Sequence, residues 1–181
     1  MMKRELLSEN DIARMLSRMA HEIIERNEGC EDVCIVGIHR AGVHIARRLS
    51  QRILLIEGVS IAVASLDISF YRDDLNLRKH HPIVRKTEMP ININDKKIIL
   101  VDDVLYTGRT IRAAMDALND FGRPAQIQLA VLIDRGHREL PIRADYVGKN
   151  IPTSRSENIK VLLKEDGQQD MVLVIRTEGL A

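Results

Sequence analysis

The stretch IILVDDVLYTGRT (residues 98–110) decides the fold of this chain. It runs four apolar residues directly into two adjacent carboxylates, Asp102 and Asp103, and then into a Thr-Gly-Arg-Thr turn. Like charges side by side at the end of a buried element repel each other and are costly to desolvate. Such a pair is expected where a ligand compensates for that cost.

Short apolar runs alternate with amphipathic segments on both sides of this stretch. The pattern predicts strands at 33–38, 59–71, 98–101, 125–134, 145–151, 158–163 and 171–175, and helices at 11–27, 42–55 and 110–122. We interpret the charged N-terminus as helical and the long polar tract at 72–97 as a lid, a hairpin or a disordered segment. The alternation indicates one α/β domain over 1–181, with an open, mostly parallel sheet flanked by helices and a small β-rich C-terminal part.

Composition excludes several classes of protein. The 181 residues carry a net charge of only +1, so the global balance does not indicate a nucleic-acid binder, although a local basic surface is still possible. Cys30 and Cys34 are too few for a zinc site or a disulfide framework and are interpreted as ordinary thiols. No apolar run approaches the ~20 residues of a membrane span, and the start of the chain lacks a signal-peptide pattern, so we expect a cytoplasmic protein without membrane contact.

The residues around the acid pair indicate a sugar phosphate as the ligand. In open α/β sheets, ligands bind beyond the carboxyl ends of the strands. Carboxylates there can accept hydrogen bonds from vicinal hydroxyls or orient a hydrated metal ion. Thr107, Gly108 and Thr110 lead into a helix N-terminus, where free amides favour a phosphate. Neither a G-x-x-x-x-G-K-[ST] loop nor a G-x-G-x-x-G turn after a strand is present, which argues against the common nucleotide folds.

The segment 98–118 closely resembles the phosphoribosyl-diphosphate (PRPP) binding motif of the type I phosphoribosyltransferases. The resemblance extends over nearly the whole chain. Segments 18–27, 68–75 and 131–154 are similar to a branch of that family in which uracil phosphoribosyltransferase activity is combined with attenuation of pyrimidine operons. The resemblance implies the type I phosphoribosyltransferase fold, with PRPP and uracil as substrates.

The resemblance also implies roles for individual residues of the motif. Asp102 and Asp103 would hold the ribose 2′- and 3′-hydroxyls. The loop that binds the 5′-phosphate would consist of Val104, Leu105, Tyr106, Thr107, Gly108, Arg109 and Thr110. Mg²⁺ is the expected cofactor, held mainly by PRPP itself and assisted through water by the two acids.

Three further segments complete the substrate site that the resemblance implies. The diphosphate loop would lie in GIHRAG and contain His39, Arg40, Ala41 and Gly42. Here the chain departs from the family, which commonly has Thr-Arg before the last glycine. The tract after Tyr71 would close over PRPP, with Arg72 as a diphosphate contact, and uracil would be read by backbone groups near Ile151 and Pro152.

A second function, RNA binding, needs a basic surface, and the sequence offers two. One is the polar face of the first helix, and the other is RGHRELPIR (135–143). An exposed polar helix face is usually only solvated, but the resemblance implies binding of pyrimidine operon leader mRNA through Ser17, His21, Arg138 and Arg143, because arginine both contacts phosphate and stacks on bases. Arg135 adjoins Asp134, so a role in the active site or in an ion pair is an alternative for it.

Regulation would follow from a shared pocket, in which UMP or UTP changes the affinity for RNA. A homo-oligomer, a dimer or larger, would multiply the basic surface. Two alternatives to the bifunctional interpretation stay open at this point. One is a regulator that keeps the pocket as a nucleotide sensor with little transferase activity, which the departure at Arg40 and Ala41 favours. The other is a base-salvage phosphoribosyltransferase without an RNA role.

Overall fold

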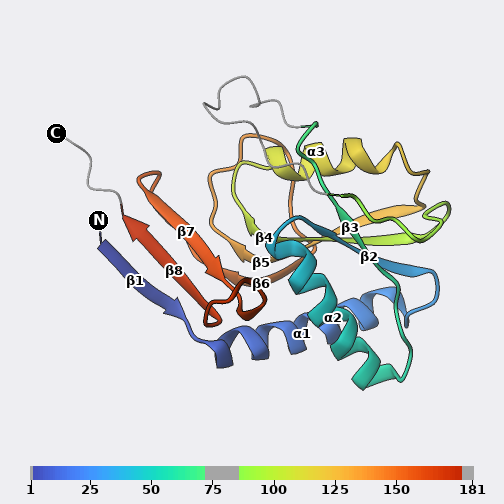
Figure 1. Cartoon of the computed structure of the whole chain (residues 1–181), viewed down its shortest axis with the longest axis horizontal. Helices are drawn as coiled ribbons and strands as arrows, with labels where there is room; N and C mark the ends of the chain where they lie inside the picture. Colours follow the sequence, from blue (N-terminus) through green and yellow to red (C-terminus); the bar gives the residue numbers. More distant parts are fainter. Residues whose placement is uncertain (1, 72–85, 177–181) are drawn as a thin grey trace.

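The computed structural model describes residues 2–71 and 86–176, which form two sheets and three helices (Figure 1). All five strands of the larger sheet are parallel. In spatial order they are β3 (Val63–Leu66), β2 (Val33–Ile38), β4 (Lys97–Leu105), β5 (Gln126–Asp134) and β6 (Tyr146–Asn150). This architecture confirms the predicted α/β class with a mostly parallel sheet.

Helices cover both faces of the parallel sheet, as its continuous apolar strands require. Helices α1 (Glu9–Asn27) and α2 (Ala41–Glu57) pack on one face, and α3 (Arg109–Leu118) packs on the other. Alternate residues of β4 point to opposite faces: Ile99 and Val101 pack with α1 and α2, whereas Ile98 and Leu100 pack with α3. The chain therefore has two apolar cores with the sheet between them.

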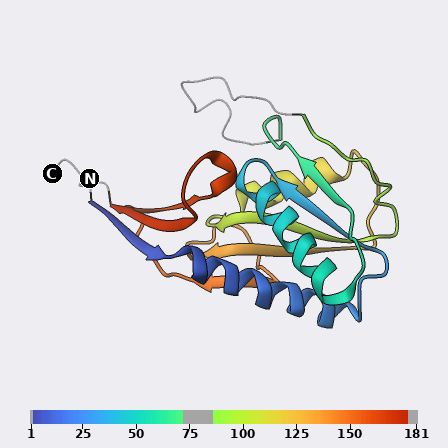
Figure 2. The ribbon, with the colours of Figure 1, turned by 60° about the horizontal axis from the view of Figure 1, so that its bottom comes forward.

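The smaller sheet lies at one end of the molecule (Figures 1 and 2). It is antiparallel, in the order β1 (Met2–Leu7), β8 (Met171–Arg176), β7 (Glu157–Leu162), and the short 3-10 helix η2 (Lys164–Asp166) joins β7 to β8. The β-rich C-terminal part is thus confirmed. The helical interpretation of the N-terminus is wrong, because residues 2–7 form a strand whose hydrogen-bond partner lies about 170 residues away in the sequence.

Two predicted strands differ from the structure by several residues, whereas the bounds of the others agree to within one residue. The strand predicted at 59–71 is restricted to Val63–Leu66, because the residues before it are irregular and those after it turn toward the tract at 72–85. The strand predicted at 98–101 runs on to Leu105, so both acids lie within β4 and not beyond its end. Pairing with β5, which continues to Leu105 opposite Asp134, holds the extra residues in the strand.

The order of the strands places a topological switch point between β2 and β4. From β2 the chain crosses through α2 to β3 on one side, and from β4 it crosses through α3 to β5 on the other side. The β2–β4 pairing ends at Gly37 opposite Val101, one residue before the acid pair. Such a switch point at the carboxyl ends of parallel strands is where open α/β sheets bind ligands.

The described residues also bear on membrane association. Among residues 2–71 and 86–176, no helix combines the length and the apolar character needed to cross a membrane.

Gly42 provides a test of how closely the first turn of α2 packs on β4. A Cβ at this position would lie 2.4 Å from the carbonyl oxygen of Val101 and 3.2 Å from the Cα of Asp102. We expect Gly42→Ala to lower the free energy of unfolding by about 1–3 kcal/mol, the usual cost of overpacking against backbone atoms that cannot move aside. Urea denaturation measures the change.

The matched control for Gly42→Ala is Gly58→Ala at the end of the same helix. A Cβ at Gly58 meets nothing within 4 Å, although its φ of 71° makes alanine strained there. We expect the control to cost only about 1 kcal/mol. Equal losses for the two variants would contradict close packing of α2 on the site strand.

Candidate active site

The acid pair lies on β4 just beyond the end of its pairing with β2, next to the residues that follow it along the chain. The Asp102 carboxylate is buried and accepts a hydrogen bond from the backbone amide of Asp103 at 2.9 Å. The Asp103 carboxylate accepts one from the amide of Val104 at 2.8 Å, and Asp103 is partly exposed. These bonds fix both carboxylates on the part of β4 that extends past β2.

Burial raises the pKa of the Asp103 carboxyl, because desolvation penalises its charged form. Hydrogen bonds to Asp102 and to the Val104 amide favour the charged form, but they do not outweigh burial. A carboxylate held in this way gains from any ligand that donates hydrogen bonds to it or brings a cation beside it. The electrostatics therefore agree with the prediction of a ligand at this pair.

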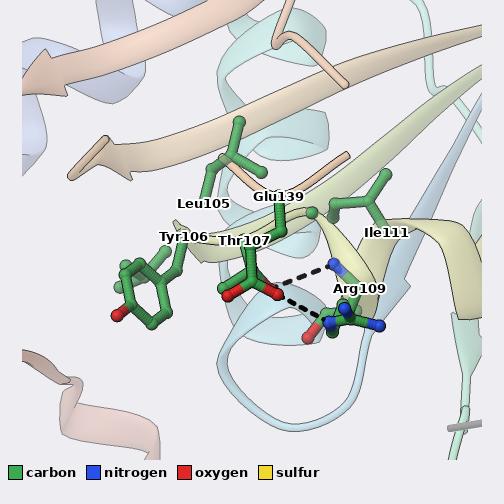
Figure 3. Close-up of a pocket in the computed structure, with 9 residues that line it drawn as sticks. Leu105, Tyr106, Thr107, Arg109, Ile111 and Glu139 are labelled. Atoms are coloured by element: carbon green, nitrogen blue, oxygen red, sulfur yellow. Dashed lines mark hydrogen bonds and ion pairs between the residues drawn. The ribbon is translucent and has the colours of Figure 1, made fainter. Parts of the chain in front are cut away.

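The chain after the acids surrounds a cavity of about 360 Å³ (Figure 3). Thr107 Oγ1 accepts a hydrogen bond from the backbone amide of Arg109 at 3.4 Å, and the Arg109 guanidinium donates to Glu139 at 2.9 Å. The structure thus brings the predicted phosphate loop together around one cavity, which is lined by Val104, Leu105, Tyr106, Thr107, Gly108, Arg109, Thr110, Ile111 and Glu139.

Helices α2 and α3 begin after the carboxyl ends of β2 and β4, and their N-termini lack side-chain caps. The N-cap position is occupied by Arg40 in α2 and by Gly108 in α3. Within the described part of the chain, neither N-cap residue makes a side-chain capping bond, and neither helix has an acidic residue in its first turn. By contrast, Ser8 and Asp11 form a complete capping box on α1. Free amides and the positive ends of α2 and α3 make both N-termini suitable for anions.

The loop after β5 braces the phosphate loop from outside. The amides of Glu139 and Leu140 both donate to the carbonyl of Thr107, at 3.0 and 3.2 Å. The guanidinium of Arg138 donates to the carbonyl of Tyr106 at 2.7 Å and is also paired with Asp134. The phosphate loop is therefore shaped by residues about 30 positions further along the chain.

The predicted diphosphate loop (His39, Arg40, Ala41, Gly42) lies beside the acid pair, because Gly42 packs on the backbone of β4. The peptide bond between His39 and Arg40 is cis. His39 Nε2 is buried and has no hydrogen-bond partner in the described part of the chain. The exposed Arg40 side chain is paired with Asp166 of η2 at 3.1 Å, so in this structure it is held by the smaller sheet.

The structure describes only some of the other residues that were predicted to contact the substrates. Ile151 continues from β6, and its amide donates to the carbonyl of Asp134 at 2.8 Å, which puts Ile151 and the exposed Pro152 at the same edge of the sheet as the acid pair. Arg72 and most of the predicted lid lie outside the described residues. These roles stay predictions.

The residues predicted to bind RNA divide into two groups. Ser17 and His21 are exposed on α1, and Arg143 is exposed just before β6. Arg18, on the same helix face, donates to the carbonyls of Val147 and Gly148 and so brings α1 against β6. Arg138 differs, because its guanidinium is partly buried and occupied by oxygen atoms of the chain.

Two site residues had no local sequence signal. Glu139 lines the phosphate cavity and holds Arg109, and Asp166 holds Arg40. Glu139 belongs to the loop after β5 and Asp166 to η2, and both reach the site only through contacts between segments far apart in the chain. Motif spacing cannot reveal such partners.

The acid pair fits a magnesium ion that is held mainly by a ligand. Mg²⁺ prefers oxygen atoms and keeps several of its waters, so two carboxylates at the carboxyl edge of the sheet are a suitable donor set. Among the described residues, no group of three or more His, Cys, Asp or Glu side chains is arranged to hold a metal ion by itself.

Comparison with known proteins agrees with this geometry. The model of the phosphoribosyl transferase domain matches residues 3–179. The crystal structure of the hypoxanthine phosphoribosyltransferase of Trypanosoma cruzi has the same fold, with a TM-score of 0.72 and 18% identity, and the alignment covers 97% of each chain.

Curated relatives are much more similar in sequence. The bifunctional protein PyrR of Caldicellulosiruptor bescii is 57% identical over 94% of each chain. That of Bacillus mycoides is 59% identical over 95% of this chain and 97% of its own length. The chain belongs to the phosphoribosyltransferase family, and within that family to the PyrR proteins.

The raised pKa of Asp103 predicts a pH-dependent effect of Asp103→Asn on stability. A carboxyl whose folded pKa is raised stabilises the fold below its unfolded pKa, and this contribution is lost as the pH rises through the folded pKa. Ionisation of Asp103 therefore destabilises the wild type but cannot occur in Asp103→Asn, so we expect the variant to gain Tm relative to the wild type as the pH rises. Calorimetry from pH 7 down to pH 3 should show this relative gain shrinking as wild-type Asp103 becomes protonated.

Asp116→Asn on α3 is the matched control, because the Asp116 carboxylate is exposed. We expect its Tm to stay close to that of the wild type across the same pH range. A Tm for Asp103→Asn that falls relative to the wild type as the pH rises would show that the ionised carboxylate stabilises the free protein, contrary to this argument.

Proposed function

We propose that this phosphoribosyltransferase transfers the phosphoribosyl group of PRPP to uracil, giving UMP and diphosphate, and that it also binds pyrimidine operon leader mRNA. One observation carries the enzymatic half of this proposal: a carboxylate pair lies at the switch point of a parallel sheet, where α2 and α3 begin after the neighbouring strands β2 and β4 without a side-chain bond from their N-cap residues. PRPP has the matching chemistry, because its ribose diol lies between a 5′-phosphate and a diphosphate.

The reaction breaks the bond between the anomeric carbon and the diphosphate oxygen, and a bond from a uracil nitrogen replaces it. The nitrogen loses its proton, and the transition state has oxocarbenium character. No protein nucleophile is needed, so positioning and charge stabilisation supply most of the catalysis.

Each segment around the acid pair then has a proposed role in binding the substrates. Asp102 and Asp103 accept hydrogen bonds from the ribose hydroxyls and fix the ring. The amides at the start of α3, with Thr107 and Thr110, hold the 5′-phosphate, and the loop 39–42 at the start of α2 receives the diphosphate. Backbone groups near Ile151 and Pro152 read uracil, and Arg72 is proposed as a further diphosphate contact.

Phosphoribosyltransferases generally use Mg²⁺ with PRPP, and we propose the same for this chain. The ion would neutralise charge on the diphosphate as it leaves. Asp102 and Asp103 would assist its binding through water molecules, in agreement with their oxygen donors and the partial exposure of Asp103.

The RNA-binding surface would consist of the exposed face of α1 with Ser17 and His21, together with Arg143 and Arg138. The contact of Arg18 with β6 supports a continuous surface, because it brings α1 close to the strand that follows Arg143. Arg138 would then have two tasks, because it also braces the phosphate loop. UMP or UTP in the pocket would change the affinity for RNA through this shared region.

Three further assignments belong to the same proposal. The chain would form one phosphoribosyltransferase domain, as the match over residues 3–179 supports. It would assemble as a homo-oligomer, a dimer or larger, and act in the cytoplasm.

One observation favours a second candidate, a nucleotide sensor with little transferase activity. The Arg40 side chain, which departs from the family pattern, is paired with Asp166 and is not turned toward the acid pair by any recorded contact among the described residues. Enzymatic assay separates the two candidates.

The enzymatic proposal is tested with purified protein, PRPP, Mg²⁺ and radiolabelled uracil, with formation of UMP as the measurement. We expect Asp103→Asn to lower kcat/KM for PRPP about 10- to 100-fold, because a hydrogen bond to a charged group contributes about 1.5–3 kcal/mol. Asp116→Asn should leave the rate unchanged. Binding of UMP without any turnover by the wild type would favour the sensor.

The regulatory proposal is tested by filter binding of a pyrimidine operon leader stem-loop at several salt concentrations, with and without UMP. We expect UMP to tighten binding several-fold. His21→Ala and Arg143→Ala should weaken it, and loss of one arginine–phosphate contact should reduce the salt slope by roughly 0.7–0.9.

Arg112→Ala is the control for RNA binding, because this exposed arginine lies on α3, on the opposite face of the sheet from α1. Its affinity for RNA should equal that of the wild type. If the leader is not bound at any nucleotide concentration, the regulatory half is wrong and the chain is a base-salvage phosphoribosyltransferase.

A further inference from the structure

Arg135 is the first residue after β5 and is almost completely buried, with 4% of its surface exposed. Its backbone amide donates to the carbonyl of Leu105, the last residue of β4, at 3.1 Å. Arg135 therefore lies at the carboxyl edge of the sheet, between the phosphate loop that follows β4 and the segment that follows β6.

The guanidinium of Arg135 contacts both of these segments. On one side it stacks over the ring of Tyr106 in the phosphate loop, with 4.1 Å between its central carbon and the ring centroid. On the other side it donates to Thr153 Oγ1 at 3.0 Å and to the carbonyls of Ser154 and Glu157 at 3.1 and 2.5 Å. One planar group thus bridges the two halves of the proposed substrate site.

A second bridge lies beside the first. His137 Nε2 is hydrogen-bonded to the carbonyl of Thr153 at 2.5 Å, and its ring meets that of Tyr106 edge-on, with centroids 5.9 Å apart. In Figure 3 the Tyr106 ring points away from the side chains of Thr107 and Arg109. Tyr106 therefore contributes its backbone to the phosphate loop and its ring to the bridge.

The electrostatics of Arg135 differ from those of the other buried arginine. Arg48 is neutralised by Glu165 and Asp170, with contacts of 2.5 and 2.6 Å. Within the described part of the chain, the acceptors recorded for Arg135 are hydroxyl, amide and carbonyl oxygens and an aromatic ring. A buried cation with neutral partners is costly to desolvate, so the many hydrogen bonds that hold Arg135 must offset that cost.

The geometry of the sheet shows which distance the Arg135 bridge fixes. The acid pair lies on β4 and the segment 151–154 follows β6, two strand spacings or roughly 10 Å away. A nucleotide that spans these points must find its phosphate, ribose and base sites at fixed separations. Tying Thr153 and Ser154 to Tyr106 fixes that separation directly.

We propose that Arg135 is a positioning residue that holds the base-binding segment 151–154 in register with the phosphate loop. This inference rests on the proposed function, because it assumes that uracil is read at 151–154. Arg135 touches neither the diol nor the phosphate in this scheme. It acts by making the base site and the phosphate site available to one ligand at the same time.

The test compares a ligand that spans both sites with a ligand that uses only one. UMP carries base, ribose and phosphate, whereas ribose 5-phosphate lacks the base. We expect Arg135→Lys and Arg135→Gln to weaken UMP binding about tenfold or more, while the affinity for ribose 5-phosphate changes less than about threefold, because only simultaneous engagement is lost. Isothermal titration calorimetry measures both affinities.

Arg48→Lys is the matched control, because it also disturbs a buried arginine attached to the smaller sheet. It should lower Tm but leave the ratio of UMP to ribose 5-phosphate affinity unchanged. Should both Arg135 variants fail to fold, Tyr106→Leu takes their place, since it removes the stacking partner and keeps the hydrogen bonds of Arg135. We expect it to lower the same ratio.

An unchanged ratio in folded Arg135 variants, or in Tyr106→Leu if only that variant folds, would overturn the inference and leave the proposed function intact. A wild-type protein that binds ribose 5-phosphate but gains nothing from the uracil of UMP would be a different result. It would overturn the uracil assignment and this inference together.

Discussion

The site depends on a difference in length between two neighbouring strands. β4 is paired with β5 as far as Leu105 but with β2 only as far as Val101. Beyond that point the chain after β2 turns into α2, and Gly42 packs directly on β4. The acid pair therefore lies on β4 beyond its pairing with β2, at the end of the sheet where α2 and α3 begin after β2 and β4.

In the absence of a ligand, the groups around the acid pair lower the stability of the fold. Burial raises the pKa of Asp103, and neither α2 nor α3 has the N-cap side-chain bond and capping box that Ser8 and Asp11 give to α1. Groups left in this condition cost stability in the free protein, and a diol flanked by phosphates would satisfy them together. Destabilisation concentrated at a binding site is a common consequence of function.

The smaller sheet is a second support for the site. It is anchored to α2 by the buried Arg48 with Glu165 and Asp170, and it holds the diphosphate-loop residue Arg40 through Asp166. Arg135 also connects the smaller sheet to the phosphate loop. Its guanidinium donates a hydrogen bond to the carbonyl of Glu157, and Glu157 is the first residue of β7. The relative placement of the substrate subsites is thus shared between two sheets.

The sequence by itself determined the alternating α/β fold, β2 at its observed bounds, the acid pair and the loop after it, because apolar periodicity and the 98–110 motif are local signals. Only the tertiary structure decided the length of β4, the strand at 2–7 and the partners Glu139, Asp166 and Arg135. Each of these depends on hydrogen bonds or ion pairs between distant segments, which no local pattern encodes.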